Sequence, residues 1–436
     1  MQLTGVLPDT ARVSSTGHLE LGGCDAVELA REFGTPVYVF DEMTLRQKAR
    51  TYVDAVSQSY PDALVLYASK AYVNVALARL LAEEQLGFDV VSGGELYVVR
   101  KAGVDLRKVY FHGNNKTPAE LTQALEWGVG RIVIDSAYEL ELLSRLATER
   151  GQQVDVLLRI SPGVEAHTHD FLKTGILDSK FGFPISTGQA DEALRAALAA
   201  PSLNVVGLHC HIGTQIFEIE PYGEAIDRVF GFAANHKAAG LNLREFSPGG
   251  GWGIKYTTGD DPRALGESVK AVAGYVRAAA DRHGFGLPKL VIEPGRSMVA
   301  NAGVALYTVG ARKEIPGVRT YVSIDGGMGD NIRPAIYGAK YEALVANRAN
   351  ESGGETVTIA GKYCESGDIL IRDVELPRLS AGDVLAVPAS GAYCLAMASN
   401  YNLHGRPAVV LVKDGKARLI RRRESYEDLT ACDVAE

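Results

Sequence analysis

Short apolar runs alternate with longer amphipathic segments over the middle of the chain. Eight runs have the length of β-strands and end in small, polar or glycine residues; they cover residues 63–69, 88–92, 109–113, 131–135, 154–160, 205–212, 244–249 and 289–294. The amphipathic segments have helical spacing and cover residues 74–85, 94–102, 119–128, 138–150, 189–200, 222–239 and 265–283. Such alternation predicts a parallel sheet, and eight units fit a closed (β/α)₈ barrel; a doubly wound open sheet is the alternative.

The pattern changes after about residue 300. Strand-like runs then follow one another without helices between them, at residues 303–311, 320–324, 355–360, 384–387, 408–413 and 416–421. The first 35 residues also do not fit a barrel, since 16–21 resembles a strand and 25–33 a helix. We therefore predict an α/β protein with a TIM-like barrel over residues 36–298 and a mostly β domain built from residues 1–35 together with 299–436.

Composition excludes several classes of protein. The 436 residues carry 45 Lys+Arg against 53 Asp+Glu, a net charge of −8, which argues against a nucleic-acid or membrane-surface binder. No stretch approaches the roughly 18 apolar residues of a membrane helix, and no secretory signal pattern is visible, so we expect a cytoplasmic protein. The five cysteines are odd in number and widely spread, which disfavours disulfides or a cysteine zinc site.

Conspicuous polar residues gather at the ends of the predicted strands. In a barrel these ends meet on the face that carries the chemistry. Lys70 follows the first run, Asp89 lies in the second, and Asn114 and Asn115 end the third. The sixth, seventh and eighth runs end at residues 209–214, 247–251 and 293–296. We therefore expect one catalytic face.

Two of these positions suggest a phosphorylated carbonyl cofactor. Lys70 is either a solvated lysine at a strand end or a buried amine of lowered pKa that forms a Schiff base. Glycines 249–251 form either a tight turn or a phosphate cradle of unobstructed backbone N–H groups. Because no dinucleotide fingerprint or Walker loop is present, we expect a cofactor smaller than a nucleotide.

The histidine pairs and an acidic residue help to identify the cofactor. His-x-His occurs at residues 167–169 and 209–211 and invites a zinc interpretation, but the other strand ends lack suitable ligands. An imidazole could instead stack on an aromatic cofactor ring. Glu293 either pairs with Arg296 or holds a protonated ring nitrogen. An amine, a phosphate cradle, a stacking ring and a carboxylate together indicate pyridoxal 5′-phosphate and no metal.

Motifs along nearly the whole chain carry a family resemblance. They lie at residues 67–71, 163–169, 174–175, 179–182, 209–215, 249–254, 293–296, 333–337, 364–368 and 391–393. In these motifs the chain resembles the fold-type III pyridoxal-phosphate decarboxylases. One mild departure is Trp252, where an aliphatic residue or Phe is usual in the family.

The resemblance implies a role for each matching residue. Lys70 would bind the cofactor covalently, His211 would stack on its ring, and Glu293 would hydrogen-bond the ring nitrogen. Cys364 would protonate the substrate at Cα. The other implied cofactor-binding residues are Asp89, Thr214, Gly250, Gly251, Gly295, Arg296 and Tyr393. The implied substrate-binding residues are Arg296, Arg333, Tyr337, Glu365 and Tyr393.

The resemblance also implies a homodimer, a small amino-acid substrate and shared active sites. Cys364 and Glu365 would come from the partner subunit. A carboxylate rather than an arginine at the ring nitrogen favours decarboxylation over racemisation. The implied reaction converts meso-2,6-diaminopimelate to L-lysine and CO₂, because an anion and an arginine fork suit the distal ammonium and carboxylate. The alternatives are a decarboxylase of D-ornithine, D-lysine or another diamino acid, and a non-catalytic cofactor-binding or regulatory homologue.

Overall fold

The computed structural model describes residues 3–164 and 179–435 and divides the chain into two compact units. We call residues 49–253 with 262–297 the barrel unit, and residues 1–48, 254–261 and 298–436 the β unit. Strand β4 (Val37–Asp41), which our proposed boundary assigned to the barrel, pairs with β14 (Gly303–Ile315) and β20 (Ala408–Lys413). Its five residues are all buried, which suits a strand in the interior of a sheet.

The barrel unit contains the eight predicted strands in the predicted order, all parallel to their neighbours. They are β5 (Ala63–Ala68), β6 (Gly87–Val90), β7 (Val109–Phe111), β8 (Arg131–Ile134), β9 (Val154–Ser161), β11 (Leu203–His209), β12 (Glu245–Gly249) and β13 (Lys289–Ile292). Pairing of β8 with β9 and of β13 with β5 closes the ring, so the sheet is a barrel and not an open sheet. A short strand, β10 (Phe183–Pro184), adds to β9.

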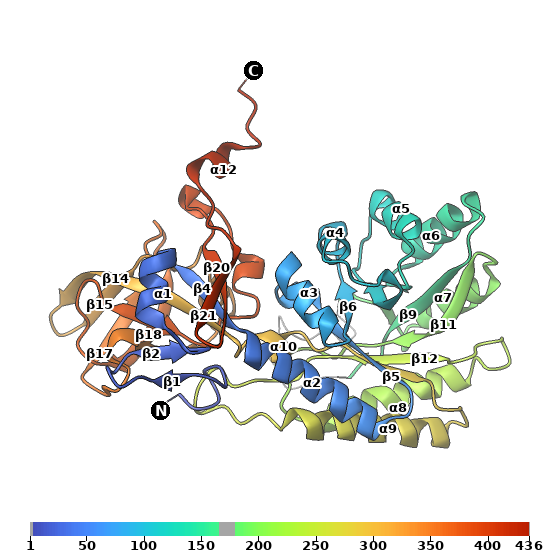
Figure 1. Cartoon of the computed structure of the whole chain (residues 1–436). Helices are drawn as coiled ribbons and strands as arrows, with labels where there is room; N and C mark the ends of the chain where they lie inside the picture. The colour runs from blue at the N-terminus through green and yellow to red at the C-terminus, as the bar shows by residue number, and fades with distance from the viewer. Residues whose placement is uncertain (1–2, 165–178, 436) are drawn as a thin grey trace. The chain divides into compact units, whose positions relative to one another are not determined.

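Helices follow the strands and surround the barrel (Figure 1). They are α3 (Val75–Glu83), α4 (Gly93–Lys101), α5 (Pro118–Trp127), α6 (Ala137–Glu149), α7 (Gln189–Ala199), α8 (Glu220–Ala234) and α9 (Leu265–Arg282), with 3₁₀ turns at Ser69–Ala71 and Leu106–Lys108. Ser92 and Ser136 accept backbone N–H groups as N-caps, and Thr117 forms a capping box with Glu120. Within the described ranges, no helix has the length and apolar character to cross a membrane.

Polar and apolar side chains fill the barrel below the carboxyl ends of its strands. Tyr110 packs in a buried apolar cluster with residues such as Leu66 and Leu157. Its hydroxyl donates to Glu245 Oε2 at 2.7 Å, and Arg131 pairs with the same carboxylate at 2.6 Å. Glu245 and Arg131 begin their strands, so this ion pair occupies the amino end and leaves the carboxyl ends for other chemistry.

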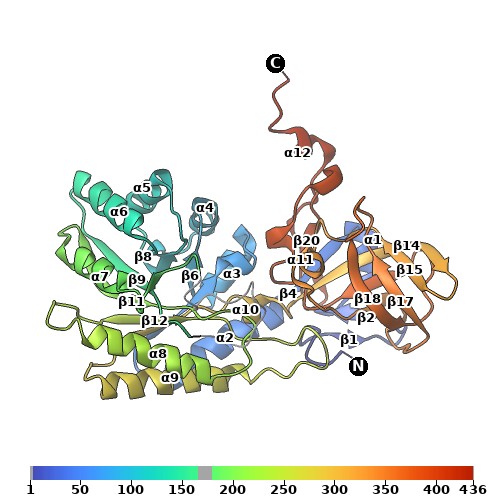
Figure 2. The ribbon, with the colours of Figure 1, turned by 180° about the vertical axis from the view of Figure 1, so that it is seen from behind.

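The β unit contains a mixed sheet with strand order β18-β17-β15-β14-β4-β20-β21. Most of these strands are labelled in Figure 2. The further strands are β15 (Arg319–Ile324), β17 (Glu355–Ala360), β18 (Ile369–Leu376), β19 (Val384–Val387), β21 (Lys416–Arg421) and β16 (Leu344–Val345). A small sheet of β1 (Arg12–Val13), β2 (Leu19–Leu21) and β3 (Cys24–Asp25) precedes helix α1 (Ala26–Phe33). Two helices, α2 (Glu42–Ser59) and α10 (Arg296–Val299), run across a boundary between the units. Short helices α11 (Arg333–Tyr337) and α12 (Tyr426–Thr430) and 3₁₀ turns at Ala346–Arg348, Leu395–Met397 and Tyr401–Leu403 complete the unit.

Candidate active site

The carboxyl ends of the barrel strands bring several ionisable side chains together. Asp89 lies in β6, His209 ends β11, and Glu293 directly follows β13. Lys70 follows β5 and is near enough to act electrostatically on both Asp89 and His211. The expectation of one polar face at the strand ends therefore agrees with this arrangement.

Glu293 is buried and its carboxylate is held from two sides. Ser247 Oγ donates to Oε1 at 2.8 Å, and His209 Nε2 lies 3.1 Å from Oε2. A second histidine, His112, places its Nε2 3.4 Å from Oε1 and 3.9 Å from a carboxylate oxygen of Asp89. Among the described residues, the ion pairs of Glu293 are with these two histidines, and the Arg296 guanidinium donates to Thr214.

Burial and charge set opposite protonation preferences in this cluster. Burial alone would raise the pKa of Glu293, but His209 and His112 hold that pKa well below its usual range. Burial lowers the pKa of His209 to about 4, although Glu293 opposes this shift. Burial raises the pKa of Asp89, against the influence of His112 and Lys70. At neutral pH the cluster therefore contains an ionised Glu293 and a neutral His209.

The triple glycine after β12 brings backbone close to the same place. A Cβ on Gly250 would lie 2.0 Å from the carbonyl oxygen of Glu293, and one on Gly251 would lie 2.3 Å from the carbonyl oxygen of Gly213. Gly251 also has φ +107°, which disfavours any side chain. The backbone N–H of Gly250 donates to His211 Nδ1 at 3.4 Å. The loop and the imidazole are thus adjacent.

Two buried aromatic side chains pack against this glycine loop. The Tyr222 hydroxyl donates to the Gly250 carbonyl at 2.8 Å. The Trp252 ring stacks on Tyr222 at 6.1 Å between centroids and an interplanar angle of 12°. Trp252, the departure noted in the sequence, is therefore a buried packing residue of the loop.

An arginine and a hydroxyl lie beside the loop, and a second arginine lies near the buried ionisable cluster. Arg296 is buried and donates through Nε and Nη2 to Thr214 Oγ1 at 3.3 and 3.2 Å. Gly295 packs tightly, because a Cβ there would lie 3.0 Å from the Ala68 side chain. Arg159 is buried, forms an ion pair with Asp135 at 3.4 Å, and acts electrostatically on the buried cluster.

Of the two alternatives for Lys70, a solvated lysine or a buried amine, the structure has the first, because the side chain is exposed at the end of β5. The 3₁₀ turn Ser69–Ala71 places it just beyond the last buried residue of the strand. An exposed amine remains accessible to a carbonyl compound, so Lys70 can still form a Schiff base.

The β unit places Arg333 in an aromatic setting. Arg333 is 5% exposed, its guanidinium lies 4.5 Å from the Tyr256 ring centroid and 5.6 Å from that of Tyr341, and Nη1 donates to the Tyr341 hydroxyl. Within residues 3–164 and 179–435, no carboxylate forms an ion pair with it. Two other predicted residues of this unit, Tyr337 and Tyr393, are half-buried, and Tyr393 has φ +61°.

Cys364 and Glu365 lie in the loop between β17 and β18, and both are exposed. The Cys364 backbone N–H donates to Asn402 Oδ1 at 2.8 Å. The base of the loop is fixed by Asp368, whose carboxylate accepts the N–H groups of Met328 at 2.7 Å and Tyr363 at 2.8 Å. The loop thus presents a thiol and a carboxylate from a fixed backbone.

Comparisons with known proteins give a consistent assignment. Residues 45–300 match the family model of the pyridoxal-dependent decarboxylases, pyridoxal binding domain. The diaminopimelate decarboxylase of Bacillus subtilis (strain 168) is 49% identical over 98% of each chain, and that of Halalkalibacterium halodurans is 47% identical over 98% of this chain and 97% of its own. This chain belongs to the diaminopimelate decarboxylase family. A crystal structure of diaminopimelate decarboxylase from M. jannaschii in co-complex with L-lysine has a TM-score of 0.90 and 38% identity, and covers 98% of each chain.

Members of this family use pyridoxal 5′-phosphate, and the barrel residues of this decarboxylase fit that group. Oδ1 of the buried Asp89 has no hydrogen-bond partner among the described residues, so the site holds unsatisfied polar capacity. The glycine loop has no room for side chains, while Thr214 and Arg296 offer a hydroxyl and a cation suited to phosphate. The cofactor prediction is confirmed by the family assignment.

Three residues of this cluster were not predicted. His112 follows β7, two residues before the more conspicuous Asn114 and Asn115, and Arg159 lies inside the apolar run of β9. In the sequence, Ser247 is only one residue of a glycine-rich strand end. The period of two along a strand could have found Arg159, since a charged residue within a buried strand must face a polar interior. The motif residues 165–178, which include His167, His169 and Thr174, lie outside the described residues.

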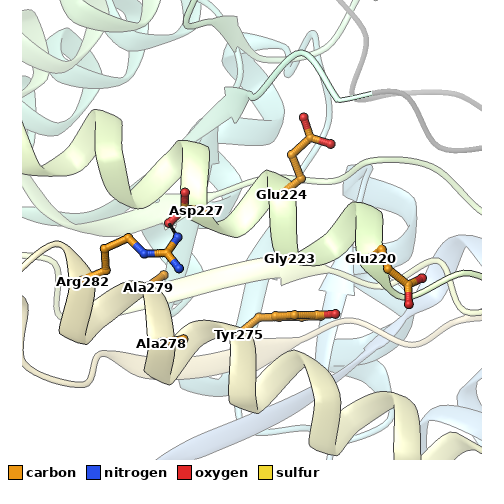
Figure 3. A pocket seen from close by; sticks show the side chains of 8 residues that line it. All are labelled: Glu220, Gly223, Glu224, Asp227, Tyr275, Ala278, Ala279 and Arg282. Atoms are coloured by element: carbon orange, nitrogen blue, oxygen red, sulfur yellow. Dashed lines mark hydrogen bonds and ion pairs between the residues drawn. The ribbon is translucent and has the colours of Figure 1, made fainter.

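A hollow of about 320 Å³ lies on the helical layer, between α8 and α9 (Figure 3). Tyr275 lies beneath Gly223, and Asp227 forms an ion pair with Arg282 at 2.6 Å. Its lining comes from helices and contains none of the strand-end residues described above. It is therefore separate from the candidate active site of the barrel.

Proposed function

We propose that this enzyme decarboxylates meso-2,6-diaminopimelate to L-lysine and CO₂, with pyridoxal 5′-phosphate as its cofactor. The observation that carries the substrate assignment is the buried Arg333, whose charge has aromatic neighbours but no carboxylate partner among the described residues. A buried guanidinium without a counter-ion is costly, and a substrate carboxylate would offset that cost. D-Lysine and L-ornithine carry no distal carboxylate and would leave the arginine unpaired.

The two relatives and the lysine-bound structure support this substrate. Each is named a diaminopimelate decarboxylase, and L-lysine is the compound that loss of CO₂ from diaminopimelate would leave. A non-catalytic homologue is disfavoured because the chain retains the lysine, the buried carboxylate and the cysteine-bearing loop together. A different diamino acid as substrate would need another partner for Arg333.

The barrel residues divide the work of holding the cofactor. Lys70 would bind it covalently through Nζ, His211 would stack on its ring, and Asp89 would lie close to both. Thr214, Gly250, Gly251, Gly295 and Arg296 would bind the phosphate, with Tyr393 contributing from the β unit. When bound, the cofactor supplies an electron sink for the electron pair left at Cα as CO₂ departs. Glu293, ionised at neutral pH, would keep the ring nitrogen protonated.

Residues of the β unit would complete the reaction. Cys364 would donate its thiol proton to Cα of the substrate once the C–C bond has broken. Glu365 would receive the distal ammonium group, and Arg333 the distal carboxylate, with Arg296, Tyr337 and Tyr393 completing the substrate set. The exposure of both Cys364 and Glu365 in their own chain suits residues that act in the site of a partner subunit.

We accordingly propose a cytoplasmic homodimer in which each site needs two chains. All five cysteines are free, as is usual in a reducing compartment. One assay tests the substrate: CO₂ release is measured from meso-diaminopimelate, D-lysine and L-ornithine at equal concentrations with the same holoenzyme. We expect kcat/KM to be at least 10²-fold higher for meso-diaminopimelate, because the other two leave the buried Arg333 unpaired. Equal rates on D-lysine would overturn the assignment.

A further inference from the structure

Two buried histidines adjoin Glu293, and the proposed reaction gives neither of them a role. His112 is 4% exposed and His209 is 1% exposed. Their rings meet edge to face with centroids 4.8 Å apart and an interplanar angle of 69°. His112 directly follows β7 and His209 ends β11, so the barrel itself brings them together. Such placement points to a shared task at the Glu293 carboxylate.

The hydrogen bonds of His209 fix its proton. Its Nε2 lies 3.1 Å from Glu293 Oε2, and a hydrogen bond to a carboxylate requires N–H there. Its Nδ1 is buried and has no hydrogen-bond partner among the described residues. A second proton on Nδ1 would create a buried donor and a buried positive charge with nothing to accept them. His209 is therefore a neutral donor with its proton on Nε2.

Buried polar groups surround both oxygens of the Glu293 carboxylate. Ser247 Oγ donates to Oε1 at 2.8 Å, and the ring of His112 stands 3.4 Å from the same oxygen. Ser247 also accepts the backbone N–H of Gly249 at 3.1 Å, which ties the carboxylate to the glycine loop. Both carboxylate oxygens are thus oriented by buried groups of the barrel.

We propose that His209, assisted by His112, is a positioning residue that holds Glu293 ionised and correctly oriented for the ring nitrogen of the cofactor. The inference rests on the proposed function, because it assumes that Glu293 meets that nitrogen. The histidines act through Glu293 and need not touch the substrate. The carboxylate alone, buried in an apolar barrel, would favour its neutral form.

The pH dependence follows from the groups that face Glu293. They are His112, His209 and Asp89; the charge of Glu293 also acts on Tyr110, Cys210 and His211, and the charges of Arg159 and Lys70 act on the same cluster. The hydrogen bond from the neutral His209, with the ring of His112 beside it, favours the ionised form of Glu293, whose pKa lies below its usual value; that form is therefore lost only as the pH falls through the lowered pKa. Removing His209 should raise the pKa of Glu293, so that the ionised form is lost at a higher pH.

The test compares His209→Leu, which removes the donor, with His209→Gln, which keeps an N–H donor in reach. Cofactor retention is measured by fluorescence between pH 5 and pH 9, with free pyridoxal 5′-phosphate as the probe. We expect His209→Leu to bind the cofactor about 10-fold or more weakly at pH 6 and to lose it at a higher pH than the wild type. His209→Gln should recover most of the binding.

A matched control separates positioning from folding. His236 is equally buried, contacts the Phe232 carbonyl at 3.0 Å and Asp191 at 3.0 Å, and lies on the helical layer. His236→Leu should lower the melting temperature and leave the pH profile of cofactor retention unchanged. An equal shift of that profile in both leucine variants would mean that His209 is only structural.

Two further outcomes are decisive. Nitrogen-15 NMR of histidine-labelled wild type reads the protonation of His209 even if the leucine variant fails to fold; a cationic ring or a proton on Nδ1 would overturn the proposal. Potential metal-ligand atoms of His112, His209 and Glu293 lie within 4.8 Å of one another. If purified wild type contains stoichiometric metal and His209→Leu does not, the cluster is a metal site instead. A wild type that binds no cofactor would refute the proposed function itself.

Discussion

Replacing Arg333 by Met separates stability from substrate recognition. The arginine is buried against Tyr256 and Tyr341 and has no carboxylate partner among the described residues. Methionine approximates the length of the aliphatic stem but carries no charge. If the guanidinium is held for a substrate anion, its loss should affect turnover much more than folding.

The expected magnitudes follow from these contacts. The substitution removes cation–π contacts of about 0.5–2 kcal/mol and a hydrogen bond to Tyr341 of about 1 kcal/mol. It also removes the cost of burying an unpaired charge, which has the opposite sign. The net change in the free energy of unfolding should stay within about 2 kcal/mol. A two-bond fork to a carboxylate involves charged hydrogen bonds of about 1.5–3 kcal/mol each, so kcat/KM should fall by about 10²-fold or more.

Urea unfolding of the ligand-free protein and steady-state CO₂ release measure the two effects. The control is Arg312→Met, which breaks a two-bond ion pair with Glu355 in the same unit and should leave kcat/KM unchanged. D-Lysine provides a second comparison. Because it has no distal carboxylate, any residual CO₂ release from D-lysine should be little changed by Arg333→Met. A variant that is destabilised by more than 3 kcal/mol while its kcat/KM for meso-diaminopimelate is unchanged would show that Arg333 is a structural residue.

Three other predictions concern the covalent attachment, the proton donor and the shared site. Lys70→Ala should abolish the borohydride-reducible attachment of the cofactor to the protein, because no other amine would replace Nζ; a retained adduct would remove Lys70 from its role. Cys364→Ala should keep the cofactor and slow turnover by roughly 10²-fold or more, whereas Cys432→Ala, also at an exposed cysteine, should be fully active. Mixing the Lys70→Ala and Cys364→Ala proteins should restore about a quarter of wild-type activity, because exchange gives about half heterodimers with one intact site each; demonstrated heterodimers without activity would place the whole site in one chain.

The alternation of apolar runs and amphipathic segments predicted the barrel well, because each strand and the helix after it have a recognisable pattern in their own stretch of sequence. The eight strand runs and their order are confirmed, and most strand bounds differ from the expected ranges by a few residues. Helix starts were also readable, as at Thr117, where a capping box precedes the helix. The strand β18 was missed because Arg372, Asp373 and Glu375 interrupt its apolar pattern, and alternation on a half-exposed strand is weak.

The boundary between the units and the contacts of Glu293 depended on distant parts of the chain. Strand β4 pairs with two strands more than 250 residues away, and no local pattern specifies such partners. His112 and Ser247 are ordinary residues in the sequence, and their importance depends on a carboxylate brought near by closure of the barrel. The motif around Glu293 predicted the carboxylate but not the groups that keep it ionised.

Three groups proposed for the chemistry and the cation proposed for substrate recognition lie in different units. The groups proposed for the chemistry common to α-decarboxylation on this cofactor, Glu293, the glycine loop and Lys70, all belong to the barrel unit. What distinguishes one diamino acid from another is its distal end, and the cation proposed to bind that end, Arg333, belongs to the β unit. Substitutions at Arg333 should therefore change which substrate is used without changing cofactor affinity, whereas substitutions at His209 should weaken the cofactor for every substrate alike. Opposite results for these two residues would mean that recognition and chemistry are not separated in this way.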